Sequence, residues 1–321
     1  MLKNKKRKII LDCDPGHDDA IAILLAAGNP NIELVGITTV AGNAEIKKTT
    51  TNALQVCEIA GIYDIPVLQG AGQPLVRKRE TAPDIHGDSG MDGPELPAPT
   101  RTIEEEHAVD FIIRELMESD GDITLVPTGP LTNIAMAMRR EPAILSKIQE
   151  IVIMGGGTFG NWTPAAEFNI YVDADAAKVV YESGVPITMM GLDLTHQALA
   201  TDEVCERIDK IENPAAKFVS ELLVFFRKTY LEVFGFEHPP VHDVCCVAYC
   251  INPSVVETKK LRVDVETKGE LTYGMTLVDV HGVTELDPNV NVAMKLDHAK
   301  FWDMVVNALE SYKEVYAAKK S

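Results

Sequence analysis

Four aspartates stand within eight consecutive residues near the start of the chain, at Asp12, Asp14, Asp18 and Asp19. They directly follow the apolar residues 9–11 and run into a helical pattern, so they are predicted to lie where a buried strand ends and a helix begins. Aspartate stabilises a helix N-terminus, which accounts for one or two of them but not for the cluster. A hard cation such as Ca²⁺ or Mg²⁺ prefers carboxylate and carbonyl oxygens and would relieve their repulsion. The spacing therefore predicts a metal site.

Two later segments add further polar groups. The carboxyl group of Glu167 and the amides of Asn161 and Asn169 lie close together in sequence and suit the neighbouring hydroxyls of a sugar. His242 and Asp243 form a histidine–aspartate pair, which is weak evidence alone because an exposed helix cap explains it about as well. Together with the aspartate cluster, this pair would add a proton donor and another metal ligand.

Strand-like and helical patterns alternate through the first two thirds of the chain. The predicted strands cover residues 8–13, 33–40, 65–68, 122–127, 150–154 and 186–190. The predicted helices cover residues 18–27, 44–60, 103–119, 131–140 and 173–183. Such alternation is typical of a mostly parallel sheet with helices on both faces.

The last third of the chain has a different order of elements. These are a helix over residues 214–234, a turn over 235–240, a short helix from about Asp243, strands over 261–266, 275–280 and 290–294, and a terminal helix over 300–318. No linker rich in Gly, Ser or Pro separates them from the preceding residues. Residues 1–321 are therefore predicted to form a single α/β domain.

A parallel sheet explains how residues far apart in sequence could form one site, because the loops after the carboxyl ends of its strands share one edge. Asp14 follows the first predicted strand, Asn43 follows the second, and Thr128 and Met154 mark the ends of two later ones. The glycines in these loops match neither GxxxxGK[ST] nor GxGxxG, the phosphate-binding motifs. They are interpreted as allowing close approach of the backbone.

Residues 70–102 contain many Pro and Gly residues and show no regular pattern. A connection of this length is usually functional or mobile, so it is predicted to be an active-site lid. A packed surface loop is the alternative, because long loops can also be structural.

The composition argues against several partners and compartments. Acidic residues outnumber basic ones 48 to 30, and the formal net charge of −18 repels nucleic acid and anionic membrane surfaces. The basic residues 1–8 lead into no apolar signal core, and no apolar run reaches membrane-spanning length, so a cytoplasmic protein is expected. The six cysteines include no CxxC pair and are interpreted as free thiols.

These motifs together resemble the inosine-uridine nucleoside hydrolase family over nearly the whole chain. The most specific is the DxDPGxDD pattern at residues 12–19, supported in the family's order and spacing by residues 41–43, 127–133, 166–169 and 241–243. The resemblance implies a single domain with a mixed, mostly parallel sheet flanked by helices and a Rossmann-like core. It also implies a homodimer or homotetramer.

The activity that the resemblance implies is a calcium-dependent hydrolysis of the N-glycosidic bond of ribonucleosides, by attack of a metal-bound water. Inosine, uridine, cytidine and other purine nucleosides would be the substrates, giving ribose and free base. Ca²⁺ would be held by Asp14, Asp19, Asp243 and the backbone carbonyl of Thr128, with Asp14 also acting as the general base. The residues implied to bind ribose or line its pocket are Asp18, Asn43, Met154, Asn161, Glu167 and Asn169. Oxygen-rich surroundings suit the oxocarbenium-like state of such a cleavage.

The leaving base must gain a proton or a hydrogen bond as it departs, and His242 and His86 are the candidates. His242 matches the family's position for a leaving-group acid. His86 stands where purine-specific relatives carry an aromatic ring, which favours a nonspecific or pyrimidine-tolerant enzyme. Tyr230 and Phe234, one helical turn apart, are predicted either to line the base pocket or to pack in the core.

Two rival functions use similar residues. An aspartate-based phosphohydrolase also begins with a strand that ends in DxD, but here Asp14 is followed by Pro15 and Gly16, and few basic residues are near to bind an anionic substrate. A non-catalytic nucleoside or sugar sensor would use the metal for binding only. It would have no need of Asp14 as a base, and no effector domain is visible.

Overall fold

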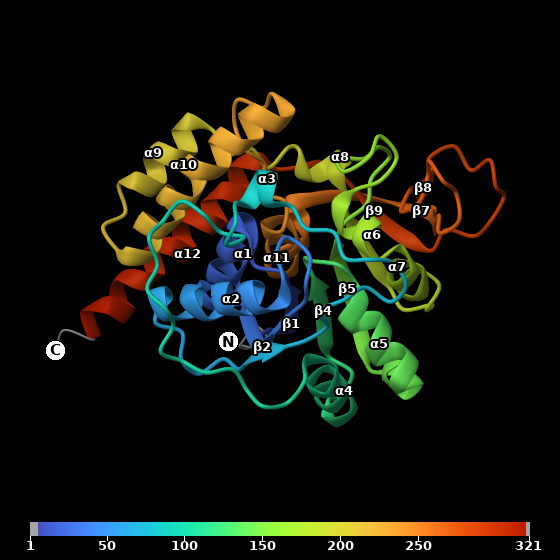
Figure 1. The fold of residues 1–321 in the computed structure, drawn as a ribbon, viewed down its shortest axis with the longest axis horizontal. Helices are drawn as coiled ribbons and strands as arrows, with labels where there is room; N and C mark the ends of the chain where they lie inside the picture. The colour runs from blue at the N-terminus through green and yellow to red at the C-terminus, as the bar shows by residue number, and fades with distance from the viewer. Residues whose placement is uncertain (1–5, 319–321) are drawn as a thin grey trace.

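The computed structural model describes residues 6–318, which form one sheet with helices on both faces (Figure 1). The strands are β1 (Arg7–Cys13), β2 (Ile32–Thr39), β3 (Val67–Gln69), β4 (Ile123–Pro127), β5 (Ile148–Met154), β6 (Ile187–Met190), β7 (Val256–Val265), β8 (Thr276–Asp279) and β9 (Val290–Leu296). The helices are α1 (His17–Gly28), α2 (Ile46–Ala60), α3 (Pro83–His86), α4 (Ala108–Glu118), α5 (Thr132–Arg140), α6 (Phe168–Val172), α7 (Ala174–Tyr181), α8 (Leu192–Thr195), α9 (Asp202–Asp209), α10 (Pro214–Phe234), α11 (Val244–Ile251) and α12 (His298–Ala318). Short 3₁₀ helices cover Pro142–Ser146 and Pro253–Val255.

The sheet has nine strands in the order β3-β2-β1-β4-β5-β6-β9-β7-β8. The pairs from β3 to β9 are parallel, whereas β7 is antiparallel to both β9 and β8. The predicted fold class, a mixed and mostly parallel sheet flanked by helices, is confirmed. Because β1 pairs with β2 on one side and β4 on the other, the aspartate cluster that follows it emerges in the middle of the parallel part.

Strand β1 shows how the apolar pattern builds the core. Ile9 and Leu11 belong to a hydrophobic cluster with residues of α1, α11 and α12, while Ile10 belongs to a second cluster with residues of α4, α5 and α7. Successive side chains of a strand point to opposite faces of the sheet. The unbroken apolar run in the sequence therefore reflects a strand that is covered on both sides.

Several boundaries differ from those predicted. The helix predicted over residues 103–119 begins only at Ala108, because the His107 side chain caps it by accepting a hydrogen bond from the Val109 N–H (3.2 Å). Asp173 likewise acts as the N-cap of α7 rather than as part of it. The strand predicted over residues 261–266 begins earlier, at Val256. Helices α3, α6 and α8 were not predicted, because four or five residues are too few for a clear apolar period. Helix α9 was also missed, although it is as long as α7 and α11.

The loop over residues 70–102 packs against α10. The Thr229 hydroxyl donates to the Ile85 carbonyl (2.9 Å), and His86 at the end of α3 is buried. The loop is thus anchored at α3, and its predicted closure over a substrate stays a prediction. All six cysteines are free, as expected, and five are buried. None of the described helices has both the length and the apolar character needed to cross a membrane.

Candidate active site

A cavity of about 250 Å³ lies at the carboxyl ends of the parallel strands, between the loops that follow them and helix α10. Of the predicted site residues, those that line it are Asp18, Asn43, His86, Thr128, Met154, Asn161, Glu167, Asn169, Tyr230, Phe234, His242 and Asp243. The other two, Asp14 and Asp19, are fully buried. Residues that were chosen from segments more than 200 residues apart in the sequence therefore lie in or beside one cavity.

Some lining residues were not singled out in the sequence: Ala82, Asp84, Ile85, Trp162, Phe168, Phe226 and Val233. Trp162 directly follows Asn161, and Phe226 precedes Tyr230 by one helical turn, so position next to a predicted residue was a usable signal for both. The remaining ones come from the loop that carries α3 or from apolar positions that resemble ordinary core.

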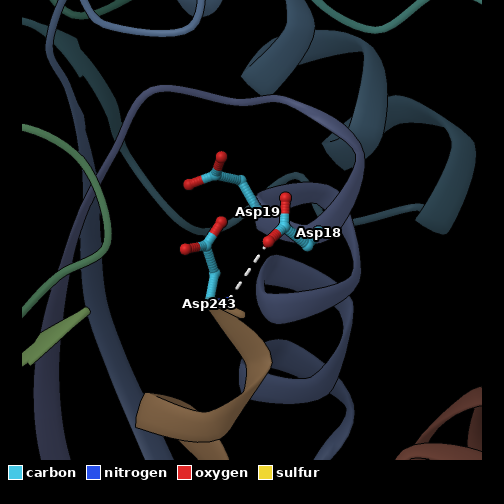
Figure 2. Close-up of side chains that lie close together, drawn as sticks. All are labelled: Asp18, Asp19 and Asp243. Carbon is cyan, nitrogen blue, oxygen red and sulfur yellow. Dashed lines mark hydrogen bonds between the residues drawn. The ribbon is translucent and has the colours of Figure 1, made fainter. Parts of the chain in front are cut away.

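Three carboxyl groups meet at the floor of the site. Asp18 and Asp19 come from the first turn of α1, and Asp243 stands directly before α11; each offers an oxygen within 4.8 Å of the others (Figure 2). The backbone N–H of Asp243 is 3.4 Å from Oδ2 of Asp18. Asp19 accepts hydrogen bonds from the Gly16 N–H (3.0 Å) and the Thr128 hydroxyl (2.8 Å). Helix α1 and helix α11 are thus joined through their acidic ends.

Asp14 lies beside this cluster in a slot between two glycines. Its Oδ2 accepts the Asn43 N–H (2.6 Å), while its buried Oδ1 has no hydrogen-bond partner among the described residues. A Cβ atom on Gly42 or on Gly129 would lie 2.9 Å from the carboxyl carbon of Asp14. The two glycines therefore leave room for this carboxyl group and for nothing larger.

The carboxyl groups are electrostatically uncompensated. Burial, together with the neighbouring carboxylates, raises the pKa of Asp14 and Asp243 well above the usual range and that of Asp18 to about 7. Burial also raises the pKa of Asp19. No lysine or arginine is found among the residues that line the cavity. A divalent cation fits this set of hard oxygen donors, and it would replace the protons.

The side of the cavity that bears Glu167 is held by backbone contacts. Glu167 caps α6, and its carboxylate accepts the N–H groups of Gly156 (3.0 Å), Asn169 (2.9 Å) and Ile170 (3.1 Å), yet burial raises its pKa to about 7. The Asn169 amide donates to the Thr128 carbonyl (2.8 Å). These polar groups are fixed before any ligand arrives.

The opposite wall is aromatic and carries the two histidines. His242 lies 2.6 Å from the Tyr230 hydroxyl through Nε2 and 2.7 Å from the Thr195 hydroxyl through Nδ1. Burial lowers the pKa of its ring well below the usual value. Tyr230 is in turn in ring contact with Phe226 and Phe234. Tyr230 and Phe234 thus line the cavity, and Tyr230 is buried as well.

Known proteins resemble this chain over nearly its whole length. Residues 9–303 match the model of the inosine-uridine preferring nucleoside hydrolases. The chain is 50% identical over 310 residues to the pyrimidine-specific ribonucleoside hydrolase RihB of Escherichia coli O157:H7, covering 96% of this chain and 98% of that protein. The purine-preferring ribonucleoside hydrolase from Gardnerella vaginalis is similar in structure, with a TM-score of 0.89 at 34% identity over 96% of this chain and 99% of that one. A plant nucleoside hydrolase has a TM-score of 0.86 at 31% identity over 95% and 99%.

Proposed function

Because the chain belongs to the inosine-uridine preferring nucleoside hydrolase family, we propose that it hydrolyses ribonucleosides to ribose and free base with the help of Ca²⁺. The observation that carries the proposal is the group of buried, uncompensated carboxyl groups at the floor of a cavity whose other wall is aromatic. Carboxylates suit a cation and a cationic transition state, and aromatic rings suit a nucleobase.

The residues that would hold the cation are Asp14, Asp19, Asp243 and the carbonyl of Thr128. All four supply hard oxygen, which favours Ca²⁺ over softer metals. Asp18 also offers an oxygen to the same cluster, although the family resemblance places it on the ribose. When bound, the cation would polarise the attacking water and orient the ribose hydroxyls.

Asp14 would act as the general base. Its Oδ2 is held by the Asn43 N–H, so the carboxyl group cannot rotate freely, and its Oδ1, which has no hydrogen-bond partner among the described residues, would take a proton from the water. Glu167 and Asn169 would bind ribose hydroxyls from their fixed positions, together with Asn43, Met154 and Asn161. Contacts that strengthen as the sugar ring flattens raise the rate rather than only the affinity.

The departing base would receive its proton or hydrogen bond from the pair of Tyr230 and His242. The ring of His242 contacts the Tyr230 hydroxyl through Nε2 and the Thr195 hydroxyl through Nδ1, so Tyr230 and His242 would be held in place to offer a hydrogen bond to the base. We propose uridine, cytidine and inosine as substrates. Of the relatives named above, RihB is pyrimidine-specific and the Gardnerella vaginalis enzyme is purine-preferring, so they do not restrict the proposal to one class of base.

The test is the initial rate of ribose release from inosine, adenosine, guanosine, uridine and cytidine, with 2′-deoxyuridine as the control. We expect rapid release of ribose from the ribonucleosides. Release of the sugar from 2′-deoxyuridine should be much slower, because this substrate lacks the 2′-hydroxyl that the carboxylate side of the site would bind. A parallel phosphomonoester panel tests the phosphohydrolase rival. Phosphate release without any release of reducing sugar would refute the proposal. Assembly as a homodimer or homotetramer stays a prediction.

A further inference from the structure

A second histidine lies behind His86, outside the cavity. His17 is fully buried, and its ring stacks nearly parallel to those of Phe225 and Phe226, with centroids 5.2 and 4.9 Å away. Its Nδ1 lies 3.1 Å from Nδ1 of His86, and its Nε2 lies 2.7 Å from the backbone carbonyl oxygen of Asp92. His86 lines the cavity, whereas His17 does not.

These two contacts determine where the protons are. A carbonyl oxygen can only accept, so Nε2 of His17 must carry a hydrogen. The carboxylate of Asp92 accepts from Ser89 and from the Asp88 N–H, and the ring of His17 bonds to the backbone carbonyl of Asp92 rather than to this carboxylate. The ring stacks on two phenyl groups, and as a neutral imidazole it carries only one N–H. Nδ1 of His17 is therefore an acceptor, and Nδ1 of His86 must donate to it.

We propose that His17 is a positioning residue that holds His86 in its Nδ1–H tautomer, so that His86 presents a hydrogen-bond acceptor to the nucleobase. The acceptor is Nε2 of His86, on the side of the ring away from His17. It would recognise bases with an N–H group on their edge, such as N3–H of uracil or the amino group of cytosine. Proton delivery to the leaving base then falls to Tyr230 and His242 and not to His86.

The backbone leaves space for this pair. A Cβ atom on Gly16 would lie 2.6 Å from Nδ1 and 2.7 Å from Cε1 of His86, closer than such atoms approach in proteins. Gly16 has an ordinary negative φ of −105°, so the requirement here is space and not backbone conformation. Gly16 and His17 are adjacent, and together they provide both the room and the hydrogen-bond partner for His86.

The direct test is the ¹⁵N NMR spectrum of the ¹⁵N-histidine-labelled wild-type protein at pH 8, with the signals assigned by His17→Leu and His86→Asn. We expect protonated Nε2 in His17 and protonated Nδ1 in His86. A protonated Nε2 in His86 would overturn the proposal. This measurement does not depend on activity, so it is distinct from the proposed function on which the assignment to the nucleobase rests. If the tautomers are as expected but no ribonucleoside is cleaved, only the proposed function fails.

A kinetic test uses His17→Leu, which keeps an apolar buried side chain but removes the acceptor. We expect His86 to lose its single tautomer and KM for uridine to rise by about fivefold, with little change in kcat, as for one lost hydrogen bond in binding. His298→Leu is the matched control, because His298 also contacts a backbone carbonyl, that of Leu199 (2.9 Å), but does not line the cavity. An unchanged KM in His17→Leu, or an equal rise in the control, would contradict the role of His17.

Discussion

Replacing Gly42 with alanine should inactivate the enzyme although it removes no functional group. The added Cβ would lie 2.9 Å from the carboxyl carbon of Asp14 and 2.7 Å from Cδ of Pro130. The carboxyl group cannot simply move to the other side, because Gly129 bounds the slot there and a Cβ at that position would also lie 2.9 Å from the same carbon. The substitution therefore forces Asp14 out of the place from which it would accept a proton.

The size of the effect follows from this displacement. To restore an ordinary van der Waals distance, the carboxyl oxygen must retreat by more than about 1 Å, and a misplacement of about 1 Å can reduce the rate by about a hundredfold. The same shift breaks the hydrogen bond from the Asn43 N–H to Oδ2 (2.6 Å). Overpacking of a buried site also lowers the free energy of unfolding by about 1–3 kcal/mol, which a domain of this size tolerates.

The assay compares kcat for ribose release from uridine at saturating Ca²⁺ in Gly42→Ala and in a matched variant, Gly72→Ala. A Cβ on Gly72 meets only the Ile46 side chain, at 3.1 Å, and that side chain can adjust. We expect a kcat loss of about a hundredfold in Gly42→Ala and nearly normal kcat in Gly72→Ala. A folded Gly42→Ala protein with nearly normal kcat would show that the position of Asp14 is not critical.

Chelation of divalent cations should abolish ribose release and Ca²⁺ should restore it, and activity that survives exhaustive chelation would refute the metal requirement. The metal-free protein should lose thermal stability as pH rises from about 4 to about 7. Burial raises the pKa of Asp18 and Glu167 to about 7, so over this range the folded protein keeps protons that the unfolded protein releases. Ca²⁺ should remove this loss, and a melting temperature that does not change with pH in the metal-free protein would contradict it. Proteolysis within residues 70–102 should slow when a ribosyl transition-state analogue is bound, and equal cleavage rates would exclude closure of the loop.

The sequence predicted those parts of the protein that depend on regular periodicity and on motifs. The buried strand that contains Asp12 and the helix that begins near Asp18 follow from an apolar run and a helical pattern, which determine β1 and α1 locally. Because parallel strands end at one edge of the sheet, the aspartate cluster, Asn43, Thr128 and Met154 could be assigned to one site from the sequence. Glu167 and His242 were added by their residue types and by the family resemblance.

The sequence could not predict contacts made by loops without a regular period. His17 and His86 meet across 69 residues, through a segment whose path no periodic pattern determines. The slot around Asp14 depends on two glycines from different loops. The distance between these glycines is set only when the chain folds. Phe226 was overlooked because an aromatic residue on a long helix is usually core, and only the position of α10 turns it toward the cavity.

Hydrolysis of the glycosidic bond is most directly tested by following uridine by ¹H NMR in phosphate-free buffer with Ca²⁺, with Asp14→Asn as the comparison. We expect ribose and uracil to appear in equal amounts, with no requirement for phosphate, and Asp14→Asn to be slower by at least about a hundredfold. Two results would contradict the proposal. In one, folded wild-type protein with Ca²⁺ leaves uridine intact. In the other, uridine is cleaved only when phosphate is added, and the product is a sugar phosphate instead of ribose.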